Sequence, residues 1–152
     1  MKYSFSGRVR FSEADENGIL SFYGLVNYLQ DCSTFHAEDN QMGPDWSRKH
    51  HQAWVLAAWQ ILIDEYPLFG EEIKVSTWAY GFRNCIGYRN YSVEKPDGTL
   101  IVRANSDWVL MDMEKNVPVK VTEEQAAAFG VYPELKLTDD FGSRKIKCPD
   151  KG

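Results

Sequence analysis

The chain is short of cysteine, of net positive charge and of long apolar runs, and each shortage excludes a class of protein. Its three cysteines, Cys32, Cys85 and Cys148, are widely spaced and odd in number. They predict neither a disulfide framework nor a metal site, and they favour a reducing, intracellular compartment. The net charge of −5 argues against a general nucleic-acid binder, whose affinity comes mainly from phosphate neutralisation.

Membrane and export signals are also lacking. No run approaches the roughly 20 apolar residues that span a bilayer, and the first residues lack the apolar core of a signal peptide. We therefore expect a cytoplasmic protein whose partners include neither nucleic acid nor membrane.

Aromatic residues, in contrast, are plentiful. They make up 14% of the chain and include 5 tryptophans, and such large rings suit a core or a lined pocket. The length of 152 residues corresponds to one domain. We assign residues 1–135 to this domain and residues 136–152 to a polar C-terminal tail.

One long helix is predicted near the N-terminus, after a strand at residues 3–11 and a loop at residues 12–20. Apolar residues recur at helical spacing from Ser21, a suitable N-cap, to Asp39. Gly24 is unusual there, because a glycine inside a helix costs about 1 kcal/mol relative to alanine. Either the helix begins later, or another group approaches the backbone closely at this position.

The rest of the chain alternates with a period of two and predicts consecutive strands. They cover residues 54–66, 72–80, 86–94, 99–111 and 117–121, with a short helix at residues 46–50. Thr122 and Gln125 form a capping box for another short helix. Consecutive strands favour an antiparallel sheet, which is the only large surface against which the long helix can pack. We therefore predict an α+β hotdog fold, a long central helix wrapped by a curved antiparallel β-sheet.

Asp15 is the strongest candidate for chemistry. It lies in a glycine-containing loop just before the long helix, where a carboxylate can combine with backbone N–H donors that stabilise an oxyanion. This combination suggests acyl transfer. An aspartate in such a loop is also a common turn or cap residue, and the sequence leaves both roles open.

Several segments resemble acyl-ACP thioesterases, in an order and spacing that extend from about residue 6 to about residue 130. They are residues 25–30, 54–56, 63–67, 70–78 and 104–112. Residues 12–18 are similar to the 4-hydroxybenzoyl-CoA thioesterase group, in which the aspartate at the position of Asp15 is catalytic. Acyl-ACP thioesterases generally carry two hotdog repeats, with the catalytic polar residues in the second, whereas this chain resembles the first. Phe22 stands seven residues after Asp15, so no histidine assists there.

The resemblance implies a thioesterase that hydrolyses acyl-ACP or acyl-CoA to a free, fatty acid without metal or cofactor. Asp15 would act as general base or nucleophile, and the backbone N–H groups of Tyr23 and Gly24 would bind the thioester oxygen. The expected substrate-binding residues are Asn17, Gly18, Phe22, Val26, Asn27 and Trp54. The expected substrate has a medium or long aliphatic chain.

Two other functions stay open. One is a non-catalytic acyl-binding module, and the other is a hotdog dehydratase, which would need a His/carboxylate pair that the sequence does not place. Arg83, Arg89 and Arg103 are candidates for phosphate contacts or plain solvated charges. Because the predicted sheet has open edges, we expect a homodimer or a dimer of dimers.

Overall fold

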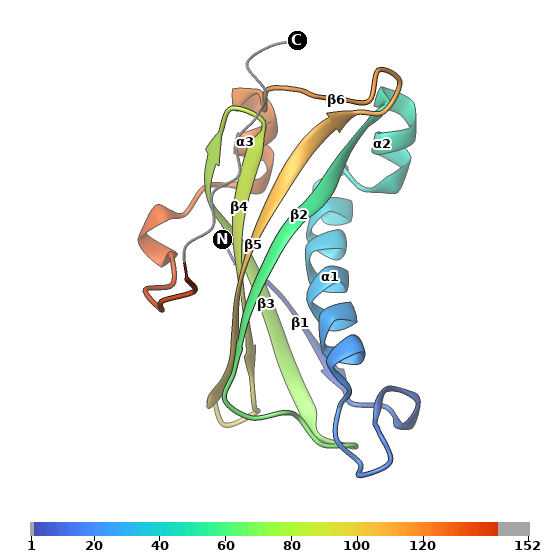
Figure 1. Ribbon diagram of the computed structural model, residues 1–152, viewed down its shortest axis with the longest axis vertical. Helices are drawn as coiled ribbons and strands as arrows, with labels where there is room; N and C mark the ends of the chain where they lie inside the picture. The colour runs from blue at the N-terminus through green and yellow to red at the C-terminus, as the bar shows by residue number, and fades with distance from the viewer. Residues whose placement is uncertain (1, 143–152) are drawn as a thin grey trace.

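An antiparallel sheet curls around one long helix in the computed structural model, which describes residues 2–142 (Figure 1). The sheet has the strand order β1-β3-β4-β5-β2, and the short β6 pairs with β5. The strands are β1 (Tyr3–Arg8), β2 (Gln52–Ile63), β3 (Glu72–Arg83), β4 (Ile86–Glu94), β5 (Leu100–Asp112) and β6 (Val117–Pro118). The α-helices are α1 (Phe22–Asp39), α2 (Pro44–His50) and α3 (Glu123–Phe129), and short 3₁₀ turns lie at Phe11–Glu13 and Pro133–Leu135. The predicted α+β hotdog fold is confirmed.

The long helix begins and ends where the sequence predicts. Ser21 caps α1, because its Oγ accepts a hydrogen bond from the Gly24 N–H at 3.0 Å, and the last helical residue is Asp39. Gly24 is therefore in the first turn and is closely approached. A Cβ atom there would lie 2.8 Å from Leu20 Cδ1 and 3.2 Å from the Glu13 carbonyl oxygen. The loop before the helix needs this glycine in order to pack against it.

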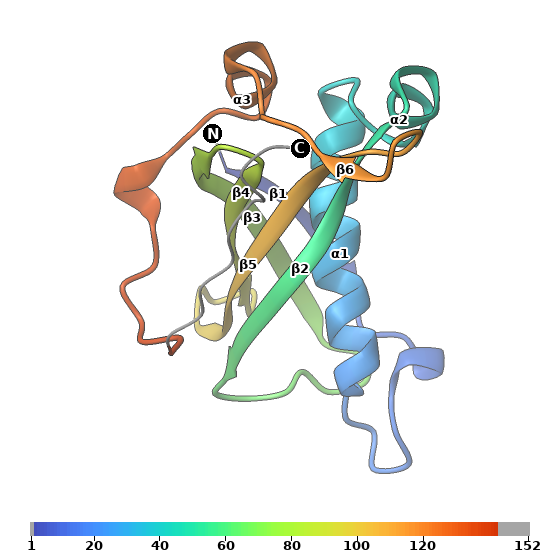
Figure 2. The same cartoon turned by 45° about the horizontal axis from the view of Figure 1, so that its top comes forward.

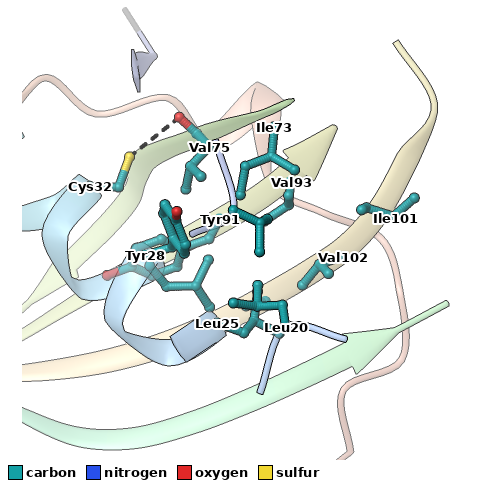
Figure 3. Close-up of a cluster of buried hydrophobic side chains, with 13 residues drawn as sticks. Leu20, Leu25, Tyr28, Cys32, Ile73, Val75, Tyr91, Val93, Ile101 and Val102 are labelled. Atoms are coloured by element: carbon teal, nitrogen blue, oxygen red, sulfur yellow. Dashed lines mark hydrogen bonds between the residues drawn. The ribbon is translucent and has the colours of Figure 1, made fainter. Parts of the chain in front are cut away.

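The core lies between α1 and the concave face of the sheet (Figure 3). Leu25 and Leu29 of α1 are fully buried, as are Val93 and Val102 of β4 and β5. Cys32, also on the buried face of α1, donates its thiol to the Val75 carbonyl at 3.5 Å. The apolar residues of α1 and the inward residues of the strands thus hold the helix in place across the sheet.

The segment at residues 131–142, here called the strap, crosses the outer face of the sheet. Its hydrogen bonds and ion pair reach β3, β4, β5 and β2 in turn. They join Tyr132 N to the Ala79 carbonyl (2.9 Å), Trp78 Nε1 to the Leu135 carbonyl (2.9 Å), Leu137 N to Asn90 Oδ1 (2.9 Å), Arg103 to Asp139 (2.7 Å) and Gln60 Nε2 to the Phe141 carbonyl (2.7 Å). Residues 136–142 of the predicted tail therefore contact the sheet, and residues 143–152 lie outside the described part.

The two edge strands differ in how far they are covered. The Tyr28 hydroxyl of α1 lies 3.1 Å from the Arg8 carbonyl at the end of β1. Among residues 2–142, no comparable contact covers the outer edge of β2, whose twelve residues include no charge and no proline. A β-bulge lies between Leu56 and Ala58, so Ala57 has no partner on β5. A long, uncharged edge of this kind is a surface that proteins normally cover or pair.

Most element boundaries match the predicted ones within three residues, and β4 matches at both ends. The capping box of Thr122 and Gln125 is also present. The cysteine prediction is wrong in one respect. Cys32 is free and buried, whereas Cys85 is disulfide-bonded.

Candidate functional site

A cavity of about 220 Å³ lies at the C-terminal half of α1. Ser33, Thr34 and Ala37 of α1 line one side, and Phe129 of α3 lies on the wall. The other walls come from the α1–α2 connection, α2 and the upper ends of the strands, where α2 and α3 stand beside the end of α1 (Figure 2). Apolar rings dominate the strand wall, namely Trp54, Phe82 and Trp108. The cavity therefore suits an aliphatic or aromatic group of limited size.

Arg89 of β4 also lines this cavity, although it is only 7% exposed. Its Nη1 makes hydrogen bonds to His36 Nδ1 at 3.0 Å and to Thr77 Oγ1 at 3.1 Å, and its Cζ lies 5.3 Å from the centre of the Phe129 ring. No acidic residue of the described chain forms an ion pair with it. An unpaired buried charge costs several kcal/mol, and burial lowers the pKa of Arg89 below its ordinary value. Arginine nevertheless keeps its proton in proteins.

His36 is the neutral partner of this arginine. Burial and then the charge of Arg89 lower the pKa of His36 from 6.5 to about 4. Its Nδ1 can accept the hydrogen bond from Arg89 only in the unprotonated ring. The positive charge of Arg89 is thus met by a neutral ring, a hydroxyl and an aromatic face.

Trp54, which lines the cavity, carries a second buried donor. Its Nε1 has no hydrogen-bond partner among the described residues, and its ring packs 6.4 Å from that of Phe129. A Cβ atom on Gly87 would lie 3.2 Å from Trp54 Cζ3, so the glycine makes room for the indole. The Trp108 Nε1, in contrast, donates to Ser106 Oγ at 2.8 Å.

The Asp15 loop is closed by its own hydrogen bonds. Asp15 Oδ1 accepts from the backbone N–H groups of Asn17 at 2.8 Å and Ile19 at 3.1 Å. The Asp15 backbone bonds to the Ile19 carbonyl at 2.8 Å, and Gly18 adopts a φ of +76°, which favours glycine. Asp15 is exposed, and its second oxygen, Oδ2, takes part in neither of these two hydrogen bonds.

Asp15 lies in the loop before α1, whereas the cavity is lined by residues of the C-terminal half of this helix. Figure 1 shows the length of α1 between its two ends. The helix has 18 residues, which corresponds to roughly 27 Å at about 1.5 Å per residue. Within one chain, therefore, the carboxylate does not reach a group bound in the cavity.

The other predicted site residues divide between the two ends. Trp54 lines the cavity, whereas Asn17 and Gly18 belong to the Asp15 loop. The other predicted residues lie on the first two turns of α1; they are Phe22, Tyr23, Gly24, Val26 and Asn27. The Gly24 N–H already donates to Ser21 Oγ. Phe22 and Tyr23 are 54% and 77% exposed, Asn27 is exposed, and Val26 is half-buried.

The sequence placed Arg89 among possible phosphate ligands and did not place His36 or Phe129 at the site. Period-two alternation could have located Arg89, since it shares the inward face of β4 with Tyr91 and Val93. Arg103 is committed to ion pairs with Asp64 and Asp139 on the opposite side of the sheet.

Residues 2–142 contain neither a metal-binding cluster nor a membrane-spanning helix. No group of three His, Cys, Asp or Glu side chains there could hold a metal ion. No helix in residues 2–142 is long and apolar enough to cross a bilayer.

Comparison with known proteins gives a family match over most of the chain. The model of the acyl-ACP thioesterase N-terminal domain matches residues 1–129. The oleoyl-acyl carrier protein thioesterase 2 of Arabidopsis thaliana, a chloroplastic protein, is 28% identical over 153 residues, covering 93% of this chain and 41% of the relative. The chain spans about two fifths of the length of this relative and of oleoyl-acyl carrier protein thioesterase 1 of the same plant.

Solved structures show the same architecture. An acyl-ACP thioesterase from Bacteroides thetaiotaomicron superimposes with a TM-score of 0.74 at 28% identity, covering 79% of this chain and 49% of that one. A 1,4-dihydroxy-2-naphthoyl-CoA thioesterase from Synechocystis has a TM-score of 0.76 at 11% identity, covering 85% of this chain and 96% of that one. The second likeness shows the fold alone.

Proposed function

Because the chain belongs to the acyl-ACP thioesterase family, we propose that it hydrolyses acyl-ACP or acyl-CoA thioesters to free fatty acids. The family match over residues 1–129 carries this proposal. The apolar cavity beneath α1 supports it, because an acyl chain needs such a space. By analogy with the relatives, the reaction would belong to fatty acid biosynthesis. The cytoplasmic location stays a prediction.

The proposed active form is a homodimer joined along the edges of β2. Two β2 strands that pair about a twofold axis run antiparallel, so the α1 helices of the two copies also run in opposite directions. The Asp15 loop of one copy then lies toward the end of the partner that holds the cavity. Ala53 and Trp54 of β2 line that cavity, which places it beside the same edge. Dimerisation would thus offset the separation along α1.

In this arrangement Asp15 supplies the chemistry. Oδ1 is held by the N–H groups of Asn17 and Ile19, which orient the carboxylate, while Oδ2 stays outside these bonds. Oδ2 would either take a proton from the attacking water or attack the thioester carbonyl itself. The N–H of Tyr23 in the first turn of α1 is the proposed oxyanion donor. The N–H of Gly24 would have to leave Ser21 Oγ in order to join it.

The second candidate is a non-catalytic acyl-binding module. It is favoured by the match to an N-terminal domain and by the engagement of Asp15 Oδ1 and the Gly24 N–H within their own turns. In this function the cavity would hold an acyl group without hydrolysing it.

Release of free thiol separates the two functions. Purified protein is mixed with octanoyl-CoA and, separately, with octanoyl-ACP, and thiol is followed with Ellman's reagent. Turnover that scales with enzyme concentration supports hydrolysis, and the better carrier is identified by kcat/KM. Saturable quenching of tryptophan fluorescence without thiol release would favour the module, since Trp54 lines the cavity.

A further inference from the structure

The cavity wall contains one charged group, Arg89, and residues 2–142 provide no counter-ion for it. The described groups that contact Arg89 are His36 Nδ1, Thr77 Oγ1 and the Phe129 ring, and all three are neutral. A guanidinium carries five N–H donors, and both of these hydrogen bonds start from Nη1. The Nη2 and Nε groups are therefore outside these bonds. Arg89 is 93% buried, so water solvates it poorly.

A second buried donor belongs to another residue of the cavity wall. Trp54 Nε1 is buried without a partner among residues 2–142, and an indole nitrogen only donates. The Phe129 ring links the two groups, since it packs against both the Trp54 ring and the Arg89 guanidinium. A cavity wall that holds a buried guanidinium without a described ion-pair partner, and an indole N–H without a described acceptor, favours a ligand that carries an anionic acceptor.

The walls around these donors are mainly apolar, so the anionic group must be attached to an aliphatic body. A cavity of about 150 Å³ lined by apolar side chains takes up benzene, which has six heavy atoms. The present volume of about 220 Å³ corresponds on this scale to roughly nine heavy atoms. Octanoate has this size.

We propose that this cavity binds the carboxylate end of a linear aliphatic chain of about eight carbons, with the carboxylate on Arg89 and Trp54. Two sources supply this chemistry. One is a free fatty acid, bound as a product or inhibitor, and the other is an acyl thioester whose far end carries a second carboxylate. The proposal rests on the proposed function only in using the same cavity, because binding requires no hydrolysis.

Binding by the 152-residue chain is the first test. Calorimetry measures the Kd of octanoate and of 1-octanol, which has the same chain without the charge. We expect octanoate to bind at least tenfold more tightly than octanol, and Arg89→Met to remove this preference while octanol binding stays within about threefold. Arg103→Met is the matched control, because Arg103 is an arginine on the opposite side of the sheet and should leave both Kd values unchanged.

Two further variants protect the test against misfolding. Arg89→Lys keeps the charge, and Trp54→Phe keeps the ring but removes the indole donor. Octanoate should bind Arg89→Lys more tightly than Arg89→Met and should bind Trp54→Phe more weakly than the wild type. Equal affinity for octanoate and octanol in the wild type would overturn the proposal. So would an octanoate preference that survives Arg89→Met.

The source is resolved by comparing octanoyl-CoA with the CoA monothioester of octanedioic acid, which differs only at its far end. Tighter binding of the dicarboxylic thioester, lost in Arg89→Met, assigns the site to the far end of an acyl substrate. Tighter binding of octanoate alone assigns it to a free acid. If the protein releases no thiol but still prefers octanoate over octanol in an Arg89-dependent way, the proposed hydrolysis is refuted and the proposed binding site stands.

Discussion

Replacing Asp15 by asparagine separates chemistry from turn formation in the loop before α1. Asparagine keeps an Oδ1 acceptor for the N–H groups of Asn17 and Ile19, so the turn should persist. The loop is also held by backbone bonds that the side chain does not touch, from Leu20 N to the Pro67 carbonyl and from Phe69 N to the Gly18 carbonyl. We expect Asp15→Asn to lower the free energy of unfolding by less than about 1 kcal/mol, or roughly 2–4 °C in Tm.

Hydrolysis should respond very differently. A positioned general base contributes about 10²–10⁴-fold, so Asp15→Asn should lower kcat/KM by at least about 100-fold. Asp15→Ala is the companion variant. It loses both hydrogen bonds of Oδ1, which are solvent-exposed and worth about 1–2 kcal/mol together, and its Tm should fall by roughly 3–6 °C.

The assays are thiol release with octanoyl-CoA and thermal unfolding by circular dichroism on the same preparations. Near-normal turnover of Asp15→Asn would remove the carboxylate from the mechanism and leave Asp15 as a turn residue. A loss of Tm in Asp15→Asn as large as in Asp15→Ala would show that the negative charge itself holds the turn.

Three other predictions follow from the structure. The pKa of His36 is about 4 in the folded protein, below its unfolded value of about 6.5. Between these pH values the unfolded chain binds a proton that the folded protein does not. The free energy of unfolding should therefore fall by about 3 kcal/mol as the pH is lowered from 6.5 to 4. Urea unfolding from pH 7 to 4 should show this loss, and His36→Gln should reduce it while the exposed His50→Gln should not. Light scattering at micromolar concentration should give a dimeric mass for the wild type, and a monomeric wild type would contradict the edge pairing. Ala57→Pro should give a folded monomer. The bulge leaves Ala57 without a β5 partner, so the proline spares the sheet but blocks pairing at the outer edge of β2. Finally, kcat/KM should rise with aliphatic chain length by up to about fourfold per methylene and then fall once the cavity is full, whereas a flat profile or a preference for acetyl or hydroxybenzoyl groups would contradict the aliphatic assignment.

Local patterns predicted most of the fold. Ser21 is a cap that can be recognised from residue type alone, and the two explanations offered for Gly24 are resolved in favour of close approach, by Leu20 and the Glu13 carbonyl. Alternation likewise located β4 between Ile86 and Glu94. These features depend on neighbours within a few residues, which is the range over which sequence patterns report structure.

The strap was not predicted because its contacts are long-range and irregular. Trp78 and Leu135 are 57 residues apart, and Gln60 and Phe141 are 81 apart, so no periodicity marks them. The site was predicted only in part for a similar reason. Alternation assigns Arg89 to a face of β4, but it cannot show that α1, α3 and His36 close over that face and deprive the guanidinium of water.

The strap also limits how many copies of this fold can assemble. With α1 on the inner face and the strap on the outer face, the sheet can grow only sideways, and the Tyr28 hydroxyl already contacts the end of β1. Each copy therefore offers one sheet edge, that of β2, for pairing with another copy. Pairing about a twofold axis uses the edge of both copies, so the ribbon ends at two and cannot extend into a filament. A larger assembly would have to use helices or the strap itself as its surface.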